Sequence, residues 1–190
     1  MYCLTLTLNG QPLCAAGHAD ASFFDVQLHA SVYDEPATLR VSGMLRDASG
    51  RSGHIYWIEE LALQAGDTVT IQPQDLAEPT PPARVEWTDS PDYIANMQAY
   101  EAFAQGDNHP PAPRAQVRAS VGVVHIHSRL GKLKAGIPLG QQHILSHVLW
   151  TATVPRPARI STRTFSGRGK LIWLQDELHD GEVLSLRLAG

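Results

Sequence analysis

The second half of this 190-residue sequence is short of acidic residues. Between Asn108 and Gln175 there is no Asp or Glu at all, whereas up to Asp107 there are 15 acidic and only 4 basic residues. The net charge of −4 therefore hides an acidic half and a basic half. Because the chain as a whole is acidic, it lacks the overall basic balance that is usual for nucleic-acid-binding proteins.

Long hydrophobic runs and cysteines are also scarce. No apolar run reaches membrane-spanning length, so we predict no contact with a membrane. The first eight residues alternate in polarity and carry no basic leader, which predicts a strand and a cytoplasmic protein. An Asn9-Gly10 turn would set Thr5 opposite Cys14, with Cys3 diagonal to Cys14 on the same face. Diagonal neighbours are about 7 to 8 Å apart, so we expect two reduced thiols.

Several catalytic motifs are missing. The chain has no Gly-x-Ser-x-Gly elbow, no phosphate-binding P-loop, no His-Glu-x-x-His and no dinucleotide fingerprint. The glycine-rich, basic run from Ser166 to Lys170 lies between two expected strands and is typical of a hairpin connection. We therefore predict a protein that is not an enzyme and needs no cofactor.

The clearest feature that is present is a repeated pattern. Gly53–Ile71 contains a hydrophobic run through Trp57, a Gly-Asp turn and an alternating strand. Gly169–Leu188 repeats this order, with Trp173 in the place of Trp57. Short strands separated by turns predict a mainly β protein with two homologous antiparallel β-sandwich or small-barrel halves, residues 1–83 and 114–190, the second an internal duplication of the first.

One helix is expected between the halves, in a linker over residues 84–113. Ser90 is suited to cap a helix that has Pro91 in its first turn, and Gly106 is a stop signal, so the helix should cover about 91–105. A helix of this length is marginal alone in water, so we expect it to dock on a sheet and bridge the halves.

The pattern LTLNGQPLCAAG, followed by Trp57, GDTVTI and a proline-rich exit, resembles uncharacterised small bacterial β-rich proteins. It covers roughly the first half of the chain. Some proteins of this type resemble immunity proteins of bacterial toxin systems. The resemblance implies a non-catalytic protein that neutralises a secreted toxin by binding over it, and it implies no catalytic residue.

Four histidines form a candidate metal site. His125 and His127 are two apart in an expected strand, and His143 and His147 share a face whether their segment is helix or strand. The run from Pro138 to His143 is similar to part of the second cupin motif, which would imply a metal-dependent enzyme. The carboxylate that should follow the first histidine pair is missing, so we favour half-exposed strand residues in a basic half.

The basic segment is a candidate for binding phosphate-rich ligands. Its ten cations are Arg114, Arg118, Arg129, Lys132, Lys134, Arg156, Arg159, Arg163, Arg168 and Lys170. Arg163, Arg168 and Lys170 flank Phe165, a mixture typical of surfaces that hold single-stranded nucleic acid. Two other interpretations compete with nucleic acid. The basic half could pair with the acidic half of the same chain, or it could recognise an acidic protein.

Binding of a protein partner is the function that we favour. The acidic first half would suit a basic partner such as a secreted nuclease, and the expected helix offers a contact surface. Trp57, Trp150 and Trp173 are expected in the core, and Trp87 is expected to be more exposed. The predicted contact residues are Asp92, Asn96, Glu101, Glu59, Glu60, Trp87, Arg163, Arg168 and Lys170.

Overall fold

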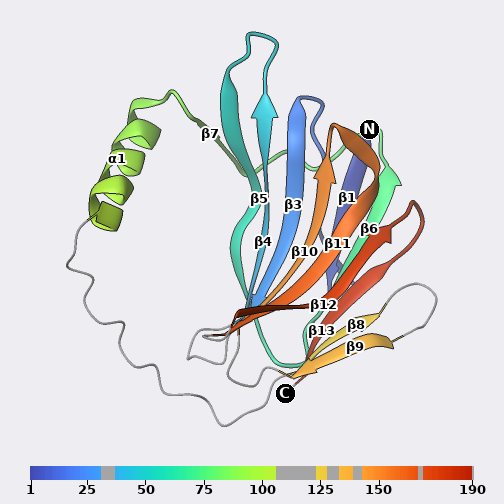
Figure 1. The fold of residues 1–190 in the computed structure, drawn as a ribbon. Helices are drawn as coiled ribbons and strands as arrows, with labels where there is room; N and C mark the ends of the chain where they lie inside the picture. The colour runs from blue at the N-terminus through green and yellow to red at the C-terminus, as the bar shows by residue number, and fades with distance from the viewer. Residues whose placement is uncertain (31–36, 106–122, 128–132, 139–142, 167–168, 190) are drawn as a thin grey trace.

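The fold was analysed in a computed structural model, which describes residues 1–30, 37–105, 123–127, 133–138, 143–166 and 169–189. These residues form two antiparallel β-sheets and one α-helix (Figure 1). The first part contains β1 (Tyr2–Leu8), β2 (Gln11–Ala16), β3 (Ala21–Ala30), β4 (Ala37–Arg46), β5 (Ser52–Leu63), β6 (Thr68–Asp75), β7 (Arg84–Trp87) and α1 (Pro91–Gln105). The second contains β8 (Val123–His127), β9 (Leu133–Pro138), β10 (His143–Thr151), β11 (Val154–Ser166), β12 (Gly169–Leu178) and β13 (Leu184–Ala189).

The two parts of the chain share both sheets. The first sheet has the strand order β2-β1-β6-β13-β8-β9, and the second has the order β12-β11-β10-β3-β4-β5-β7. Strand β6 therefore pairs with β13, and β3 pairs with β10. Neither sheet closes into a barrel in the described ranges, so the small-barrel alternative is wrong. Because strands of one part hydrogen-bond to strands of the other, the halves build one sandwich.

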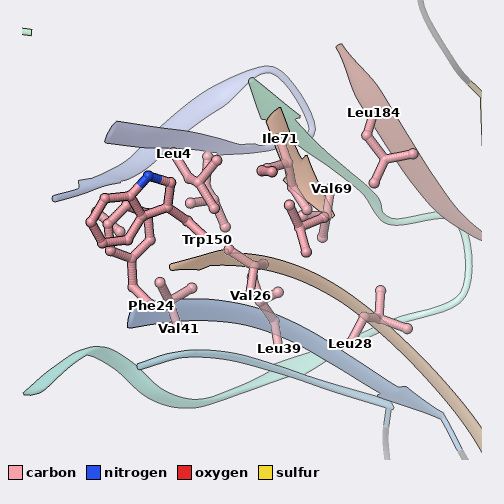
Figure 2. Close-up of a cluster of buried hydrophobic side chains, with 14 of the residues drawn as sticks. Leu4, Phe24, Val26, Leu28, Leu39, Val41, Val69, Ile71, Trp150 and Leu184 are labelled. Atoms are coloured by element: carbon pink, nitrogen blue, oxygen red, sulfur yellow. The ribbon is translucent and has the colours of Figure 1, made fainter. Parts of the chain in front are cut away.

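A single core fills the space between the sheets. Leu4, Ile71 and Leu184 come from the first sheet, and Phe24 and Trp150 come from the second. Figure 2 shows these side chains gathered between the strands. Alternation of side chains along each strand explains this pattern, because every second residue faces the opposite sheet. The prediction that Trp57 and Trp150 are core residues is confirmed, while the side chain of Trp173 lies outside the described part.

The repeated sequence pattern has a structural counterpart. Each strand from β1 to β6 corresponds to the strand seven places later, from β8 to β13. If the labels of these pairs are exchanged, the strand order of the first sheet and of the first six strands of the second sheet is unchanged when read from the opposite edge. The turns before β6 and β13 also match. Gly66 donates its N–H to the carbonyl of Leu188 at 2.7 Å, and Gly181 donates its N–H to the carbonyl of Pro73 at 3.4 Å. Both glycines have positive φ, 95° and 75°. The two turns are therefore structurally equivalent.

The first hairpin corrects the predicted register. The Asn9-Gly10 turn is present, with φ of 53° and 78°, but Cys14 pairs with Leu6 and not with Thr5. A register shift between Leu6 and Thr7 adds one residue to β2. One extra residue moves the following side chains to the other face of a strand. Cys3 and Cys14 therefore do not share a face, and both are free thiols, as expected.

Helix α1 has the predicted bounds but not the predicted position. Ser90 caps it, because its Oγ accepts a hydrogen bond from the N–H of Tyr93 at 3.2 Å. The helix does not pack on either sheet and stands beside the sandwich (Figure 1). Its contact with the sheets is at its first turn, where the rings of Tyr93 and His54 are stacked 5.6 Å apart. No helix in the described ranges is both long and apolar enough to span a bilayer.

Some of the strands and their boundaries were also missed in the prediction from the sequence. Strand β9 lies within the basic segment of the second half. Strand β5 continues past Trp57 to Leu63. Part of the expected linker forms β7, which pairs with β5 at the edge of the second sheet. The expected strand that carries His125 and His127 is β8, and residues 106–122 before it lie outside the described residues.

Candidate functional site

Helix α1 carries a row of large apolar side chains that face solvent. Ile94, Met97 and Tyr100 are 45%, 38% and 65% exposed. Their spacing of three residues places Met97 and Tyr100 on the same side of the helix, with Ile94 at the edge of that side. The helix also carries Asp92 and Glu101 and has no Lys or Arg. The surface is therefore apolar and acidic, and we refer to it as the helix surface.

The segment that leads into α1 is held to the second sheet by Arg51. Its guanidinium lies 4.3 Å from the centre of the Trp87 ring and donates from Nε to Asp89 Oδ1 at 2.7 Å. The hydrogen bond from Arg51 lowers the pKa of the Asp89 carboxyl below its ordinary value. Trp87, expected to be more exposed, is partly buried by these contacts. This anchor fixes the start of α1 although the rest of the helix is not packed.

Two predicted acidic contact residues lie on β5 and not on α1. Glu59 forms an ion pair with Arg84 at 2.8 Å, and Arg84 in turn lies 4.3 Å from the centre of the Tyr56 ring. Glu60 is exposed and makes no ion pair within the described residues. Glu59 is therefore used within the protein, whereas Glu60 remains available at this edge of the sheet.

A second feature is an open hollow of about 570 Å³ on the second sheet. It is lined by His147, Leu149, Arg159, Ile160, Ser161, Arg163, Gln175, Asp176 and Glu177, which come from β10, β11 and β12. His147, Ser161 and Gln175 are directly opposite one another on the three neighbouring strands. Directly paired residues of antiparallel strands share a face. Polar side chains thus form a continuous row across the hollow, which we call the sheet hollow.

A buried carboxylate lies next to this hollow. Asp25 on β3 is only 6% exposed, and its Oδ2 lies 3.6 Å from Nδ1 of His147. The same oxygen accepts a hydrogen bond from Gln27 Nε2 at 2.7 Å. Its other oxygen, Oδ1, and Nε2 of His147 are buried without a hydrogen-bond partner among the described residues. Buried polar atoms without partners are costly and often mark functional sites.

One ion-pair cluster connects the acidic and basic parts of the chain. Arg156 contacts the carboxylates of both Asp75 and Asp180, and its guanidinium lies 5.0 Å from the centre of the Tyr2 ring. Burial, and then the charge of Asp180, raise the pKa of Tyr2 to about 12. Some of the basic charge of the second half is therefore paired with acidic charge within the same molecule.

The predicted contact residues do not form one site. Asp92, Asn96 and Glu101 are exposed on α1, and Trp87 lies just before it. Arg163 lines the sheet hollow, separated from β7 in the strand order by β10, β3, β4 and β5. Arg168 and the side chain of Lys170 lie outside the described residues. The structure therefore offers two separate surfaces where the sequence suggested one.

The four histidines are likewise divided. Strand β8, which carries His125 and His127, belongs to the first sheet, whereas β10, which carries His143 and His147, belongs to the second. The side chains of His125, His127 and His143 lie outside the described part of the chain. Within the described residues no group of His, Cys, Asp and Glu side chains is arranged to hold a metal ion.

The sequence singled out Arg163 but not its neighbours. Ser161 precedes Arg163 by two residues, a spacing that places both on one face of a strand. Asp25 belongs to the acidic first half that was expected to face a basic partner, and nothing in the local sequence shows that β10 lies beside it. Comparison of the chain with protein-family models, curated proteins and solved structures gave no significant match.

Proposed function

We propose that this protein is a non-catalytic protein-binding protein that presents α1 to its partner. The observation that carries the proposal is the exposure of Ile94, Met97 and Tyr100 on a helix that rests on neither sheet. An isolated helix of this length is marginal in water, and most helical stability comes from packing of one face. A partner that covers this face would supply the missing packing.

The charge of the helix defines the chemistry of the partner. An amphipathic helix commonly binds by laying its apolar side chains into a hydrophobic groove. Asp92 and Glu101 border the apolar row, and no cation on α1 offsets them. The partner surface should therefore be an apolar groove bordered by Lys or Arg. Opposite charges at the rim mainly increase the association rate, so binding should be faster at low salt.

More specifically, we propose an immunity-type inhibitor of a bacterial toxin. A basic toxin, such as a nuclease, has the charge that the helix surface requires. The equivalence of the turns at Gly66 and Gly181 and the matching strand order support a sandwich that arose by internal duplication. The free thiols of Cys3 and Cys14 fit the proposed cytoplasmic location.

The experiment compares two double variants of the full chain. Met97→Ser with Tyr100→Ser removes apolar surface from the helix surface, and Ala95→Ser with Ala99→Ser alters exposed positions on the other side of α1. Each tagged protein is used to capture proteins from a lysate of the source organism, and the captured protein is then purified and titrated by calorimetry. We expect a one-to-one complex with a basic protein.

The expected result is a loss of affinity of at least about tenfold in the Met97 and Tyr100 variant, with little change in the control. Residues buried in the centre of an interface commonly contribute this much. Both variants should keep the melting temperature of the parent, because the replaced side chains pack against nothing in the sandwich. A partner that binds all three proteins equally, or the absence of any stoichiometric protein, would refute this role for α1.

A further inference from the structure

We propose that the sheet hollow binds a small molecule through an oxyanion, a phosphate or a carboxylate, held by Arg163 and Ser161. This site would be additional to the helix surface, because it lies on β10, β11 and β12 at the other end of the second sheet. Its volume of about 570 Å³ falls within the range of about 300 to 1,000 Å³ that is typical of ligand pockets.

Arg163 is already oriented by the protein. Its Nε donates a hydrogen bond to Ser161 Oγ at 2.8 Å. This bond fixes the plane of the guanidinium and leaves its two Nη groups for a ligand. No carboxylate in the described ranges lies within ion-pair distance of Arg163. A planar guanidinium presents paired N–H groups that match the two oxygens of a carboxylate or phosphate.

Ser161 provides a further donor at the same place. Its Oγ accepts from Arg163, so its hydroxyl hydrogen can point elsewhere, and it makes no other hydrogen bond within the described residues. Ser161 is only 9% exposed. A hydrogen bond from a largely buried hydroxyl to a charged oxygen is stronger than one at an open surface. Arg163 and Ser161 together therefore supply donors from two residues of one strand.

The strand register places the positive charge at one end of the hollow. Arg163 pairs with Leu145 on β10 and with Ile172 on β12, so its cross-strand neighbours are apolar residues. Arg159, four residues earlier on β11, pairs with Glu177. Opposite charges at directly paired positions offset each other. The oxyanion should therefore bind at the Arg163 end, and the polar remainder of the ligand should extend toward Gln175 and Glu177.

Asp25 and His147 support this arrangement from the adjacent strands. His147 pairs with Ser161 on one side and with Gln27 on the other. The buried carboxylate of Asp25 lies 3.6 Å from Nδ1 of His147 and limits the positions that the imidazole can take. The two atoms left without partners, Asp25 Oδ1 and His147 Nε2, are a cost that a purely structural sheet face would not need. Asp25 is accordingly assigned a positioning role.

The test is an NMR titration of the full chain, labelled with ¹⁵N, at constant ionic strength. Inorganic phosphate and acetate are the two probes of the oxyanion, and a single-stranded oligonucleotide is the third. We expect saturable shifts of the Arg163 side-chain Nε–H and of the backbone amides of Ser161 and Gln175 with phosphate or acetate. Whichever of the two anions binds more tightly identifies the chemistry of the ligand.

Two variants and a control make the titration decisive. Arg163→Gln removes the charge and should weaken binding at least about tenfold, in line with the loss of a charge-assisted bidentate contact. Ser161→Ala should weaken it by a smaller factor, because it removes one donor and the bond that orients the guanidinium but keeps the positive charge. Arg46→Gln removes an exposed arginine outside the hollow and should change nothing. The amide spectrum of each variant shows whether it is folded.

Three results would overturn the proposal. The first is the absence of saturable shifts with both anions. The second is equal weakening by Arg163→Gln and Arg46→Gln, which would indicate general charge attraction. The third is tight binding of the oligonucleotide alone, with a steep loss of affinity as salt rises, which would show that the cations bind a nucleic-acid backbone.

Discussion

The ring of Phe24 stacks on the ring of Trp150, with centroids 4.5 Å apart and ring planes 14° apart. The two residues are directly opposite each other on β3 and β10, and they come from the two halves of the chain. Stacked aromatic pairs are worth about 0.5 to 1.5 kcal/mol beyond the area they bury. The closest aromatic ring pair within the described residues therefore crosses between the halves, and the halves should fold together.

Replacing Phe24 by Ala should destabilise the whole sandwich in one step. Phe24 is 1% exposed, and removing a buried phenylalanine typically costs about 3 to 5 kcal/mol. Urea unfolding followed by tryptophan fluorescence and by far-UV circular dichroism should give a single, coincident transition at lower urea. Phe23→Ala, which changes the neighbouring and partly exposed ring, should cost less. Two separate transitions, only one of them shifted, would show that the halves have independent stability.

Replacing Gly66 or Gly181 by Ala should have similar effects. Both residues have positive φ, a conformation that costs a residue with a side chain about 1 to 2 kcal/mol. A Cβ at Gly66 would meet no atom within 4 Å, so the loss at that position should come from the backbone alone. Ala65→Ser, in the same turn as Gly66, is the control and should be neutral. Unfolding in urea measures each value, and unequal losses for the two glycines would argue against equivalent turns.

Alkaline pH should destabilise the protein through two groups, the buried Tyr2 and the partly buried Cys14. Burial raises the pKa of Cys14 from 9.0 to about 12, and burial, then Asp180, raise the pKa of Tyr2 from 10.0 to about 12. In the unfolded chain these groups lose their protons at lower pH than in the folded protein. Their contribution to stability is therefore complete below pH 9 and is lost as pH rises from about 9 to about 12.

Urea midpoints measured from pH 8 to pH 11 would test this expectation. Tyr2→Phe removes one of the two groups, so its stability should fall less steeply than that of the parent above pH 10. The comparison with the parent at each pH cancels the contributions of lysines and arginines, which both proteins share. Parallel curves for the two proteins would show that Tyr2 does not hold its proton more tightly when the protein is folded.

Short sequence patterns were sufficient to predict the elements that depend only on neighbouring residues. The cap at Ser90 and the start at Pro91 gave the bounds of α1, because capping depends on residues within one turn. The turn at Asn9-Gly10 was likewise read from its two residues. The position of α1 was not predictable in this way. The expectation that it docks assumed that an apolar helix face finds a sheet, yet both sheets already cover each other.

Long-range pairing explains most of the remaining errors. The register shift between Leu6 and Thr7 depends on how β2 fits beside β1, and no turn residue announces it. The pairing of β3 with β10 joins residues that are more than a hundred positions apart, and it places the buried carboxylate of Asp25 3.6 Å from Nδ1 of His147. The candidate site at the sheet hollow therefore needed the structure, although its most prominent cation, Arg163, was already visible in the sequence.

The close approach of β4 to β3 gives a final prediction. Gly43 pairs with Phe24, and a Cβ at position 43 would lie 2.4 Å from the carbonyl oxygen of Phe23 and 3.0 Å from the Cβ of Phe24. Opposite residues in an antiparallel pair normally keep their Cβ atoms about 4.5 to 5.5 Å apart. Gly43→Ala should therefore push Phe24 away from Trp150 and cost about 1 to 3 kcal/mol, the usual range for overpacking.

Near-UV circular dichroism and urea unfolding would measure this effect together. We expect a reduced aromatic signal, because the stacked rings of Phe24 and Trp150 lose their fixed geometry, and a lower urea midpoint. Ser42→Ala is the control, because Ser42 lies on the same strand and its side chain is partly exposed. It should leave the aromatic signal and the urea midpoint unchanged. If Gly43→Ala kept the aromatic signal and the midpoint, the strands would have room to separate locally, and the stack between the halves would not depend on the absence of a side chain at position 43.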